Sequence, residues 1–219
     1  MQLHLIRHGQ TDWNEERRVQ GQSESRLTEL GIQQAQQLGA KLRHLKFDQV
    51  YCSSSLRTRQ TAEHVFSHTD HAVEFMDELR EIHLGPWEGN LYDDVESSYP
   101  DSLNHFWNEP QLFNVSGAET FYDLQQRAVS TIEKIATEQP RKQIAIISHG
   151  ALIKSVLCHF ENLSIEQLWA PPNMHNCAHS IIEFETVGIR RITQYADRPF
   201  SEIRPDSNMQ STHSDPPAG

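Results

Sequence analysis

Two short segments of the sequence each follow an apolar run and carry side chains that could bind and transfer an anionic group. Near the N-terminus, Arg7 and His8 come directly after a run of apolar residues. Far along the chain, a Ser-His-Gly segment at residues 148–150 comes after another apolar run. A core strand gains nothing by ending in such residues, whereas guanidinium and imidazole groups are suited to binding phosphate. The two segments are therefore candidate halves of one anion-binding site.

Composition limits the kind of protein that carries these segments. The 219 residues suit one domain with a substantial core. Asp and Glu number 30 against 19 Lys and Arg, and the net charge of -11 disfavours nucleic acid and anionic membrane surfaces as partners. No signal peptide or membrane-spanning run is evident, and the three cysteines lack the spacing of a metal site. These features indicate a cytoplasmic protein whose anion site is a local cluster of positive groups.

Apolar periodicity predicts strands that alternate with helices. Short apolar runs are followed by stretches whose apolar residues recur at helical spacing, such as the stretch that Thr28 would cap. This alternation predicts an α/β fold: a three-layer sandwich with a mostly parallel sheet, helices on both faces and an antiparallel C-terminal edge hairpin. The predicted strands cover residues 2–6, 49–52, 73–75, 144–147, 177–184 and 189–195, with Gly188 in the turn of the hairpin.

Capping and turn residues assign the remaining stretches. Three serines at residues 53–55 and a capping-box pattern of Ser116 and Glu119 each precede a predicted helix. Residues 83–115 contain prolines and several aromatic residues and are expected to be irregular. Residues 164–169 fit a further short helix, and the polar tail at residues 205–219 is expected to be disordered.

The predicted fold explains how two distant segments can form one site. Sheets of this kind bind ligands at the carboxyl ends of their parallel strands. Arg7 and His8 lie just past the end of one such strand, and His149 lies just past the end of another, where a helix begins. We therefore expect both histidines at the same edge of the sheet.

Six motifs in the sequence resemble those of the histidine phosphatase superfamily, which has the phosphoglycerate-mutase-like fold. A single Arg-His-Gly would be a weak signal, but the full set occurs in the expected order and extends to about residue 195. The resemblance implies a histidine phosphatase domain over residues 1–200, in which residues 83–118 form a lid that determines substrate specificity. The motifs are LIRHGQTDWN, QGQSESRLTELGIQQA, SSSLRTRQTAE, LREIHLGPWEG, SGAETFYDLQQRA and IISHGALIK.

The chemistry that this resemblance implies is phosphoryl transfer through a histidine. Neutral His8 would attack phosphorus through one ring nitrogen and form a phosphohistidine, while its other nitrogen keeps a proton. Glu81 matches the acidic position of the family and would protonate the leaving oxygen, then deprotonate the attacking water. No cofactor and no metal are implied, because positive side chains would stabilise the phosphoryl charge. The phosphate-binding groups would be Arg7, Asn14, Arg57, His149 and the amide of Gly150.

Several of these residues also have a structural interpretation. Arg57 could be a solvated charge, although the first turn of a helix disfavours a cation unless an anion is bound nearby. Arg80 and Glu81 could form an exposed pair, and only the position in the family motif singles out Glu81. Asn14 could hold a turn instead of a ligand.

Other polar residues are interpreted as structural. Thr11 and Gln20 are expected to stabilise a loop, and Glu119 has a sufficient role as a capping-box residue, although it could reach the substrate. His64, His68 and His71 have a spacing that could bind a metal, but no Cys or carboxylate pattern completes a site, and solvated histidines are the simpler interpretation.

The family contains both phosphatases and mutases, so its fold does not decide the reaction. From His83 to Glu119, with Glu119 included, the chain has seven carboxylates and no Lys or Arg, whereas a phosphoglycerate mutase needs cations for a second anionic group. We therefore predict a metal-independent phosphomonoesterase that hydrolyses a small phosphorylated metabolite and favours an uncharged, aromatic or amine-bearing leaving group. The expected lid aromatics are Trp87, Tyr92, Phe106, Trp107 and Phe113.

Two alternatives remain at this point. The chain could be a cofactor-dependent phosphoglycerate mutase if Lys154 or Arg190 reached the pocket from outside the lid. A non-catalytic phosphate-binding or docking module is the alternative from another class, and the presence of both histidines and the acid disfavours it. The sequence does not indicate the oligomeric state.

Overall fold

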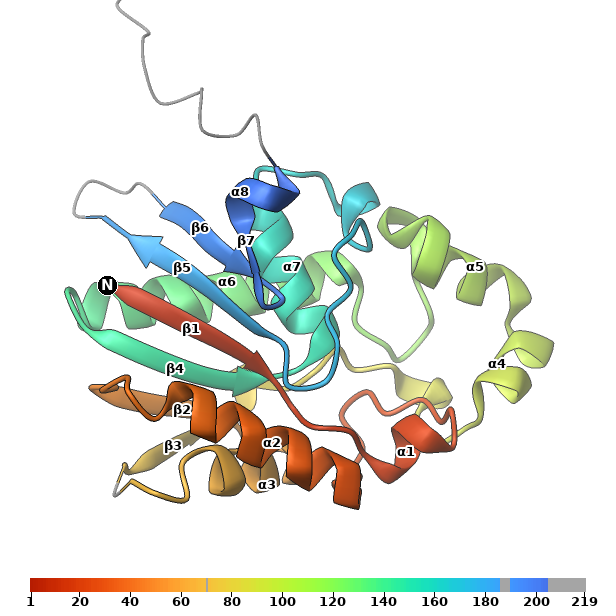
Figure 1. The fold of residues 1–219 in the computed structure, drawn as a ribbon. Helices are drawn as coiled ribbons and strands as arrows, with labels where there is room; N and C mark the ends of the chain where they lie inside the picture. Colours follow the sequence, from red (N-terminus) through yellow and green to blue (C-terminus); the bar gives the residue numbers. More distant parts are fainter. Residues whose placement is uncertain (70, 186–189, 205–219) are drawn as a thin grey trace, which may run out of the picture.

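The structure, a computed structural model, describes residues 1–69, 71–185 and 190–204. In this part of the chain, one seven-stranded sheet crosses the molecule in the order β3-β2-β4-β1-β5-β6-β7 (Figure 1). The first four strands of this order are parallel, and β5 to β7 are antiparallel. The strands are β1 (Gln2–Arg7), β2 (Gln49–Ser53), β3 (Val73–Met76), β4 (Gln143–Ser148), β5 (His179–Phe184), β6 (Arg190–Tyr195) and β7 (Arg198–Pro199).

Helices cover both faces of the sheet, as predicted. One face carries α2 (Glu29–Leu42) and α3 (Leu56–Val65), and the other carries α6 (Phe121–Glu138) and α7 (Gly150–Phe160) (Figure 1). Strands β1 and β4 are buried along their length because helices cover both of their faces, which explains their continuous apolar sequence. The predicted α/β three-layer fold with an antiparallel edge is confirmed. The predicted turn residue Gly188 and the first residue of the last run, Ile189, lie outside the described residues, as does the tail 205–219.

The register of the central strands places the two predicted site segments side by side. Residue Arg7 of β1 pairs with Ser148 of β4, and the backbone N–H of His8 donates to the Ser148 carbonyl at 3.0 Å. The chain therefore leaves both strands at the same level, so that His8 and His149 emerge at one edge of the sheet.

Two of the predicted helix caps differ from the structure. Helix α6 is capped by Thr120, whose side chain forms a capping box with Asp123, and Ser116 instead lies in a turn. The Ser116–Glu119 prediction was wrong because a second pattern of the same spacing lies four residues later, where the helix begins. At α3, Ser55 is the N-cap residue, as predicted, but its side chain forms no capping bond. The carboxylate of Glu24 accepts the first helical N–H, that of Leu56, at 2.6 Å.

The predicted irregular stretch at residues 83–115 contains two helices, α4 (Tyr92–Ser98) and α5 (Pro100–Asn108). Pro100 begins α5 instead of interrupting it, since proline fits the first position of a helix. In Figure 1 both helices lie beyond the carboxyl ends of the central strands. The remaining short elements are α1 (Asp12–Glu15), α8 (Phe200–Ile203) and the 3-10 turns Asp77–Leu79, Gly85–Trp87, Pro110–Leu112 and Ile165–Gln167, the last within the predicted short helix at 164–169.

Candidate active site

His8 has the tautomer that a nucleophilic histidine needs. Its Nδ1 lies 2.7 Å from the carbonyl oxygen of Gly9 and must donate, because a carbonyl only accepts. The proton therefore sits on Nδ1, and the lone pair sits on Nε2, which has no hydrogen-bond partner among the described residues. Burial, followed by the charges of Arg57 and Arg7, holds the pKa of His8 well below its ordinary value. The imidazole is neutral at physiological pH and carries a free lone pair.

The glycine after His8 is needed for close packing. A Cβ at Gly9 would lie 2.6 Å from the carbonyl oxygen of Gly31, which leaves no room for a side chain. The N–H of Gly9 donates to the Thr61 hydroxyl at 3.0 Å. Helices α2 and α3 thus fix the backbone on which His8 stands.

Arg7 is held on one side and has a buried donor without a partner on the other. Its Nη1 donates to the carbonyl of Met174, whereas its buried Nε has no hydrogen-bond partner in the described part of the chain. A Cβ at Gly150 would lie 3.3 Å from this Nε, so the glycine keeps the space beside it open. An anion bound beside Gly150 would satisfy the buried N–H.

Arg57 is almost fully buried, with 1% of its surface exposed. Its two Nη groups donate to the carbonyls of Ser23, at 2.8 Å, and Gly21, at 2.7 Å, and its Nε donates to His149 Nδ1 at 3.2 Å. Burial lowers the pKa of Arg57 to about 10, so the guanidinium remains charged at neutral pH. The carbonyls orient the group, and its charge faces the two histidines.

His149 lies opposite His8, with 5.4 Å between the ring centroids. Because Nδ1 accepts from Arg57, the proton sits on Nε2 and is donated to the hydroxyl of Ser53 at 2.8 Å. Burial, then Arg57, His8 and Arg7, lowers the pKa of His149 well below its ordinary value. In this arrangement both ring nitrogens have protein partners. The predicted donation from His149 to a phosphoryl oxygen would therefore require a change of hydrogen bonding when a ligand enters.

Glu81 accepts three backbone N–H groups. Its carboxylate oxygens lie 3.0 Å from the nitrogens of Ile82, Ala151 and Leu152. The last two belong to the first turn of α7, where the helix dipole favours a negative charge. Glu81 is half-buried and lines the same pocket as His8, Arg7 and Arg57, so the exposed Arg80–Glu81 pair considered above does not form.

Asn14 is positioned with its amide group available to the pocket. Its side-chain oxygen accepts from the backbone N–H of Thr11 at 3.1 Å and from Asn176 at 3.3 Å, which directs the NH₂ group away from these partners. The Thr11 hydroxyl donates to Gln20, which agrees with the predicted loop-stabilising roles. Gln20 also lines the pocket, although the sequence analysis gave it only a loop-stabilising role. Asn14 lines the pocket as the sequence analysis expected.

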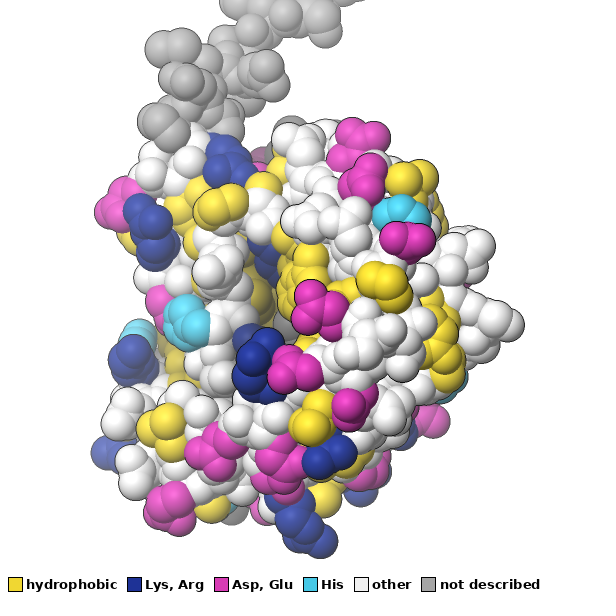
Figure 2. Space-filling view, turned by 90° about the vertical axis from the view of Figure 1, so that its right-hand side faces the viewer, with side chains coloured by type: hydrophobic (Ala, Val, Ile, Leu, Met, Phe, Trp, Pro, Cys, Tyr) yellow, Lys and Arg dark blue, Asp and Glu magenta, His cyan; other side chains and the backbone are white. Residues whose placement is uncertain are grey.

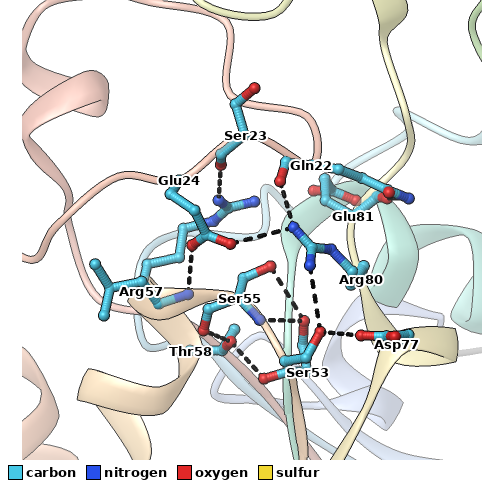
Figure 3. A network of polar contacts seen from close by, with 12 residues as sticks. Gln22, Ser23, Glu24, Ser53, Ser55, Arg57, Thr58, Asp77, Arg80 and Glu81 are labelled. Carbon is cyan, nitrogen blue, oxygen red and sulfur yellow. Dashed lines mark hydrogen bonds and ion pairs between the residues drawn. The ribbon is translucent and has the colours of Figure 1, made fainter.

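Figure 3 shows a second layer of polar contacts that joins three chain segments around Arg57 and Glu81. Arg80 donates to the carbonyl of Gln22 and pairs with Glu24 at 3.2 Å. The same arginine lies 3.4 Å from the Ser54 hydroxyl, which donates to Asp77. The loop that supplies the carbonyls for Arg57 is thereby fixed to the segment that carries Glu81.

The site opens into a pocket of about 790 Å³, whose lining includes Arg7 and the buried side chains of His8 and Arg57. We call this part of the lining the pocket floor. Figure 2 looks onto this edge of the sheet and shows a hollow with hydrophobic side chains on its wall and charged side chains at its rim. Among the predicted lid aromatics, Trp87 and Phe113 are instead buried in the core. The aromatic residues of the lining are Trp13, Tyr92, Phe106, Trp107 and Trp169, of which the sequence interpretation missed the first and last.

Cations also reach the pocket from outside the lid, and each of them has protein partners. Arg17 lies 3.7 Å from Asp93, and Arg18 lies 2.7 Å from Glu16. Lys154 donates to the carbonyls of Ala170 and Pro172. Arg190, the other candidate considered above, pairs with Glu133 and is not part of the lining.

Neither a metal-ligand cluster nor a membrane-spanning helix occurs within residues 1–69, 71–185 and 190–204. No cluster of three or more His, Cys, Asp or Glu side chains there is arranged to hold a metal ion, and His64, His68 and His71 are not brought together in one. No helix of this part of the chain is long and apolar enough to cross a membrane.

Comparison with known families shows to which family the chain belongs. The sequence model of the histidine phosphatase superfamily (branch 1) matches residues 3–197. The chain belongs to the histidine phosphatase superfamily. Membership supports an enzyme of phosphoryl transfer, and the relatives of this chain in the superfamily include phosphatases and mutase-like proteins.

Three relatives illustrate that range within the histidine phosphatase superfamily. The structure of YhfR from Bacillus stearothermophilus has a TM-score of 0.87 and 36% identity, and the match covers 90% of this chain and 96% of that one. A putative alpha-ribazole-5'-P phosphatase from Escherichia coli K-12 has a TM-score of 0.81 and 27% identity, over 91% and 97% of the two chains. A probable phosphoglycerate mutase GpmB from Salmonella choleraesuis is 29% identical over 187 residues, 84% of this chain and 86% of the relative.

Proposed function

We propose that this protein is a metal-independent phosphomonoesterase that hydrolyses small phosphate esters through a phosphohistidine intermediate. The observation that carries the proposal is the unprotonated Nε2 of neutral His8, which faces a pocket floor formed with Arg7 and Arg57. A neutral lone pair next to two fixed positive charges suits attack on a phosphoryl group, because the cations stabilise the charge of the transferred group. In this proposal residues 1–200 form the catalytic domain, and residues 83–118 form its lid.

The first half of the reaction transfers the phosphoryl group to the enzyme. The lone pair of His8 Nε2 attacks phosphorus in line with the ester oxygen, and the bond between phosphorus and that oxygen breaks. Glu81 has to carry a proton in this step and gives it to the leaving oxygen, which departs as an alcohol. The carbonyl of Gly9 holds the Nδ1 proton and so supports the positive charge that develops on the imidazole.

The second half regenerates the enzyme. Glu81, now ionised, takes a proton from a water molecule in the position that the alcohol has left. The oxygen of that water attacks phosphorus, the bond from phosphorus to Nε2 breaks, and inorganic phosphate leaves. Asn14, the unpartnered Nε of Arg7 and the amide of Gly150 would hold the phosphoryl oxygens throughout both steps.

Hydrolysis is favoured over isomerisation by the state of the pocket cations. A mutase has to bind a second anionic group of its substrate, and between His83 and Glu119 this chain provides no Lys or Arg. Of the lining cations from outside the lid, Arg18 is paired with Glu16 at 2.7 Å and Lys154 donates to the carbonyls of Ala170 and Pro172, whereas Arg17 is an exposed side chain 3.7 Å from Asp93. The aromatic wall fits an uncharged or aromatic leaving group, and Asp93 and Glu96 at the pocket would accept an amine. The predicted cytoplasmic location stays a prediction.

The test is a panel of phosphate monoesters offered to the purified protein in the presence of EDTA. Hydrolysis of aryl and small alkyl phosphates is expected to persist, with competitive inhibition by vanadate. A parallel reaction with 3-phosphoglycerate and catalytic 2,3-bisphosphoglycerate is expected to give little 2-phosphoglycerate. Loss of turnover in EDTA with recovery in Mg²⁺ would contradict metal independence, and faster isomerisation than hydrolysis would favour the mutase. Binding of vanadate without any turnover would favour a phosphate-binding module.

A further inference from the structure

The Glu119–Arg127 ion pair lies beside the segment that carries Glu81, outside the pocket lining. Arg127, on α6, binds both carboxylate oxygens of Glu119: Nε lies 2.9 Å from Oε1, and Nη2 lies 2.8 Å from Oε2. Both side chains are about four-fifths buried, with 21% and 23% of their surface exposed. A two-point contact of this kind fixes the orientation of the guanidinium plane, which a single contact would not.

The remaining donors of Arg127 reach the backbone around Glu81. Nη1 donates to the carbonyls of Glu78, at 2.8 Å, and Arg80, at 2.9 Å, and Nη2 lies 3.4 Å from the carbonyl of Glu81 itself. Each of the three guanidinium nitrogens therefore has a hydrogen-bond partner, and the three backbone carbonyls that they contact all belong to the segment 78–81.

Glu119 holds the other end of the same segment. Its Oε2 accepts the backbone N–H of His83 at 2.8 Å, and its own N–H donates to the His83 carbonyl at 2.8 Å. The pair thus fixes the backbone on both sides of Glu81, from residue 78 to residue 83. From the opposite side, the side chain of Arg80 is held by Gln22 and Glu24 (Figure 3).

This arrangement leaves the Glu81 side chain only a narrow range of positions. Its backbone is held from α6, and its carboxylate is held by the first turn of α7. A general acid has to lie within hydrogen-bond reach of the leaving oxygen, and a displacement of about 1 Å can cost about 10²-fold in rate. We propose that Glu119 and Arg127 are positioning residues that hold Glu81 at the leaving-group side of the pocket. This inference rests on the proposed function, since it concerns the acid of that reaction.

The test compares Glu119→Gln and Arg127→Lys with Glu81→Gln on two kinds of substrate. Turnover of an alkyl phosphate, which needs the acid, is expected to fall by about 10- to 100-fold in both positioning variants. An aryl phosphate, whose leaving group scarcely needs a proton, is expected to phosphorylate His8 at nearly the wild-type rate, and a burst of phenol should appear because water attack is slowed. The inhibition constant of vanadate is expected to stay within about twofold of wild type, because no phosphate ligand has been changed. Arg127→Lys retains the positive charge but loses the two-point contact with Glu119, so its turnover is expected to fall like that of Glu119→Gln.

A control variant and a double-mutant cycle separate positioning from general damage to the fold. Glu133→Gln breaks another ion pair of α6, with Arg190, and is expected to leave both substrates unaffected. In the Glu81→Gln background, adding Glu119→Gln should cause almost no further loss, because the group that it positions is already absent. Equal losses in the phosphorylation step of both substrates, weakened vanadate binding or additive losses in the cycle would each overturn the inference.

The outcomes also distinguish this inference from the proposed function. If the wild-type protein hydrolyses no phosphate ester, the proposed function fails. If Glu81→Gln shows the dependence on the leaving group and the two positioning variants do not, only the inference fails.

Discussion

Two pairs of buried histidines occur in the described part of the chain, and one member of each comes from strand β1 (His4) or from the residue that directly follows it (His8). His8 faces His149 at the edge of the sheet, and His4 stacks on His179 within it, with ring centroids 5.4 Å and 5.0 Å apart. Burial lowers the pKa of all four side chains. Judged only by burial, by the distance between the rings and by the lowered pKa, the two pairs would be equal candidates for a catalytic role.

The pairs differ in what their ring nitrogens contact. In the inner pair a directional chain uses every nitrogen: Gln194 donates to His179, which donates to His4 at 2.8 Å, which donates to Gln2 at 3.1 Å. In the outer pair, Nε2 of His8 has no protein partner among the described residues, and two arginines lie close by. A ring nitrogen that lies at a pocket and has no protein hydrogen-bond partner therefore distinguishes the candidate catalytic histidine from a core histidine whose hydrogen bonds are all made within the protein.

Removal of one histidine from each pair is the strongest test of whether only the outer pair takes part in catalysis. His8→Ala deletes the attacking atom, and turnover should fall by at least about 10³-fold, with no phosphoenzyme formed. His179→Gln deletes a buried histidine from the inner pair but leaves a side chain that can still donate to His4, and turnover at pH 7 should stay close to wild type. Steady-state rates and intact mass after a rapid quench measure both effects. A phosphorylated His8→Ala protein would show that the nucleophile lies elsewhere.

The second prediction concerns the acid beside the outer pair. Glu81→Gln keeps the nucleophile and removes proton transfer, so alkyl phosphate hydrolysis should fall by roughly 10²–10⁴-fold. Phosphorylation by an aryl phosphate should remain fast while water attack slows, which gives a burst of phenol and an acid-labile phosphate on His8.

If Glu81→Gln hydrolysed alkyl phosphates at nearly the wild-type rate, another carboxylate would have to supply the proton. The carboxylates to consider in that case are Glu88, Asp93 and Glu119, which follow Glu81 in the sequence. Glu88 accepts from the backbone of Gln22 and Leu84 and from Ser23, and Glu119 is bound to Arg127. Asp93, which lines the pocket, would then be the next residue to test.

The third prediction uses pH to test whether the inner pair is neutral in the folded protein. Burial lowers the pKa of His4 to about 4 and that of His179 to about 3, against about 6.5 in an unfolded chain. The unfolded state therefore binds more protons than the folded state below pH 6.5, and stability is lost as the pH falls from there towards 3. Each such histidine contributes a slope of at most about 1.4 kcal/mol per pH unit.

His179→Gln should reduce this slope, whatever its effect on stability at neutral pH. The measurement is the free energy of unfolding in urea at several pH values between 7 and 5, for the variant and the wild type. An unchanged slope would mean that the inner pair is not neutral in the folded protein.

The sequence predicted the outer pair but not much of what surrounds it. Local patterns reveal strand ends, so the apolar runs before His8 and His149 were sufficient to place both at one edge of the sheet. The Glu119–Arg127 contact was missed because its members lie eight residues apart and meet only when α6 packs against the segment 78–83. Helices α4 and α5 were missed because they are short and because Pro100, which begins α5, was interpreted as a sign of irregular structure. Which aromatic residues reach the pocket depends on these helices, so Trp13 and Trp169 could not be assigned.

The fourth prediction has the smallest effect and extends the comparison to aromatic side chains. Trp107 and Tyr122 are both large exposed aromatics, at 44% and 54% of their surface, but only Trp107 lines the pocket. Trp107 packs beside Trp169 at a centroid distance of 5.1 Å, and its ring remains partly exposed at the pocket. A leaving group with an aromatic ring can stack there, and such a contact contributes about 0.5–1.5 kcal/mol.

Trp107→Ala should therefore raise KM for aryl phosphates by about 2- to 12-fold and leave KM for small alkyl phosphates nearly unchanged. Tyr122→Ala is the matched control, because it removes a similar exposed aromatic outside the pocket and should change neither constant. The value of kcat should hold in both variants, since neither residue contacts the phosphoryl end. An equal rise in KM for aryl and alkyl substrates would mean that Trp107 shapes the lid as a whole, and that stacking does not select the leaving group.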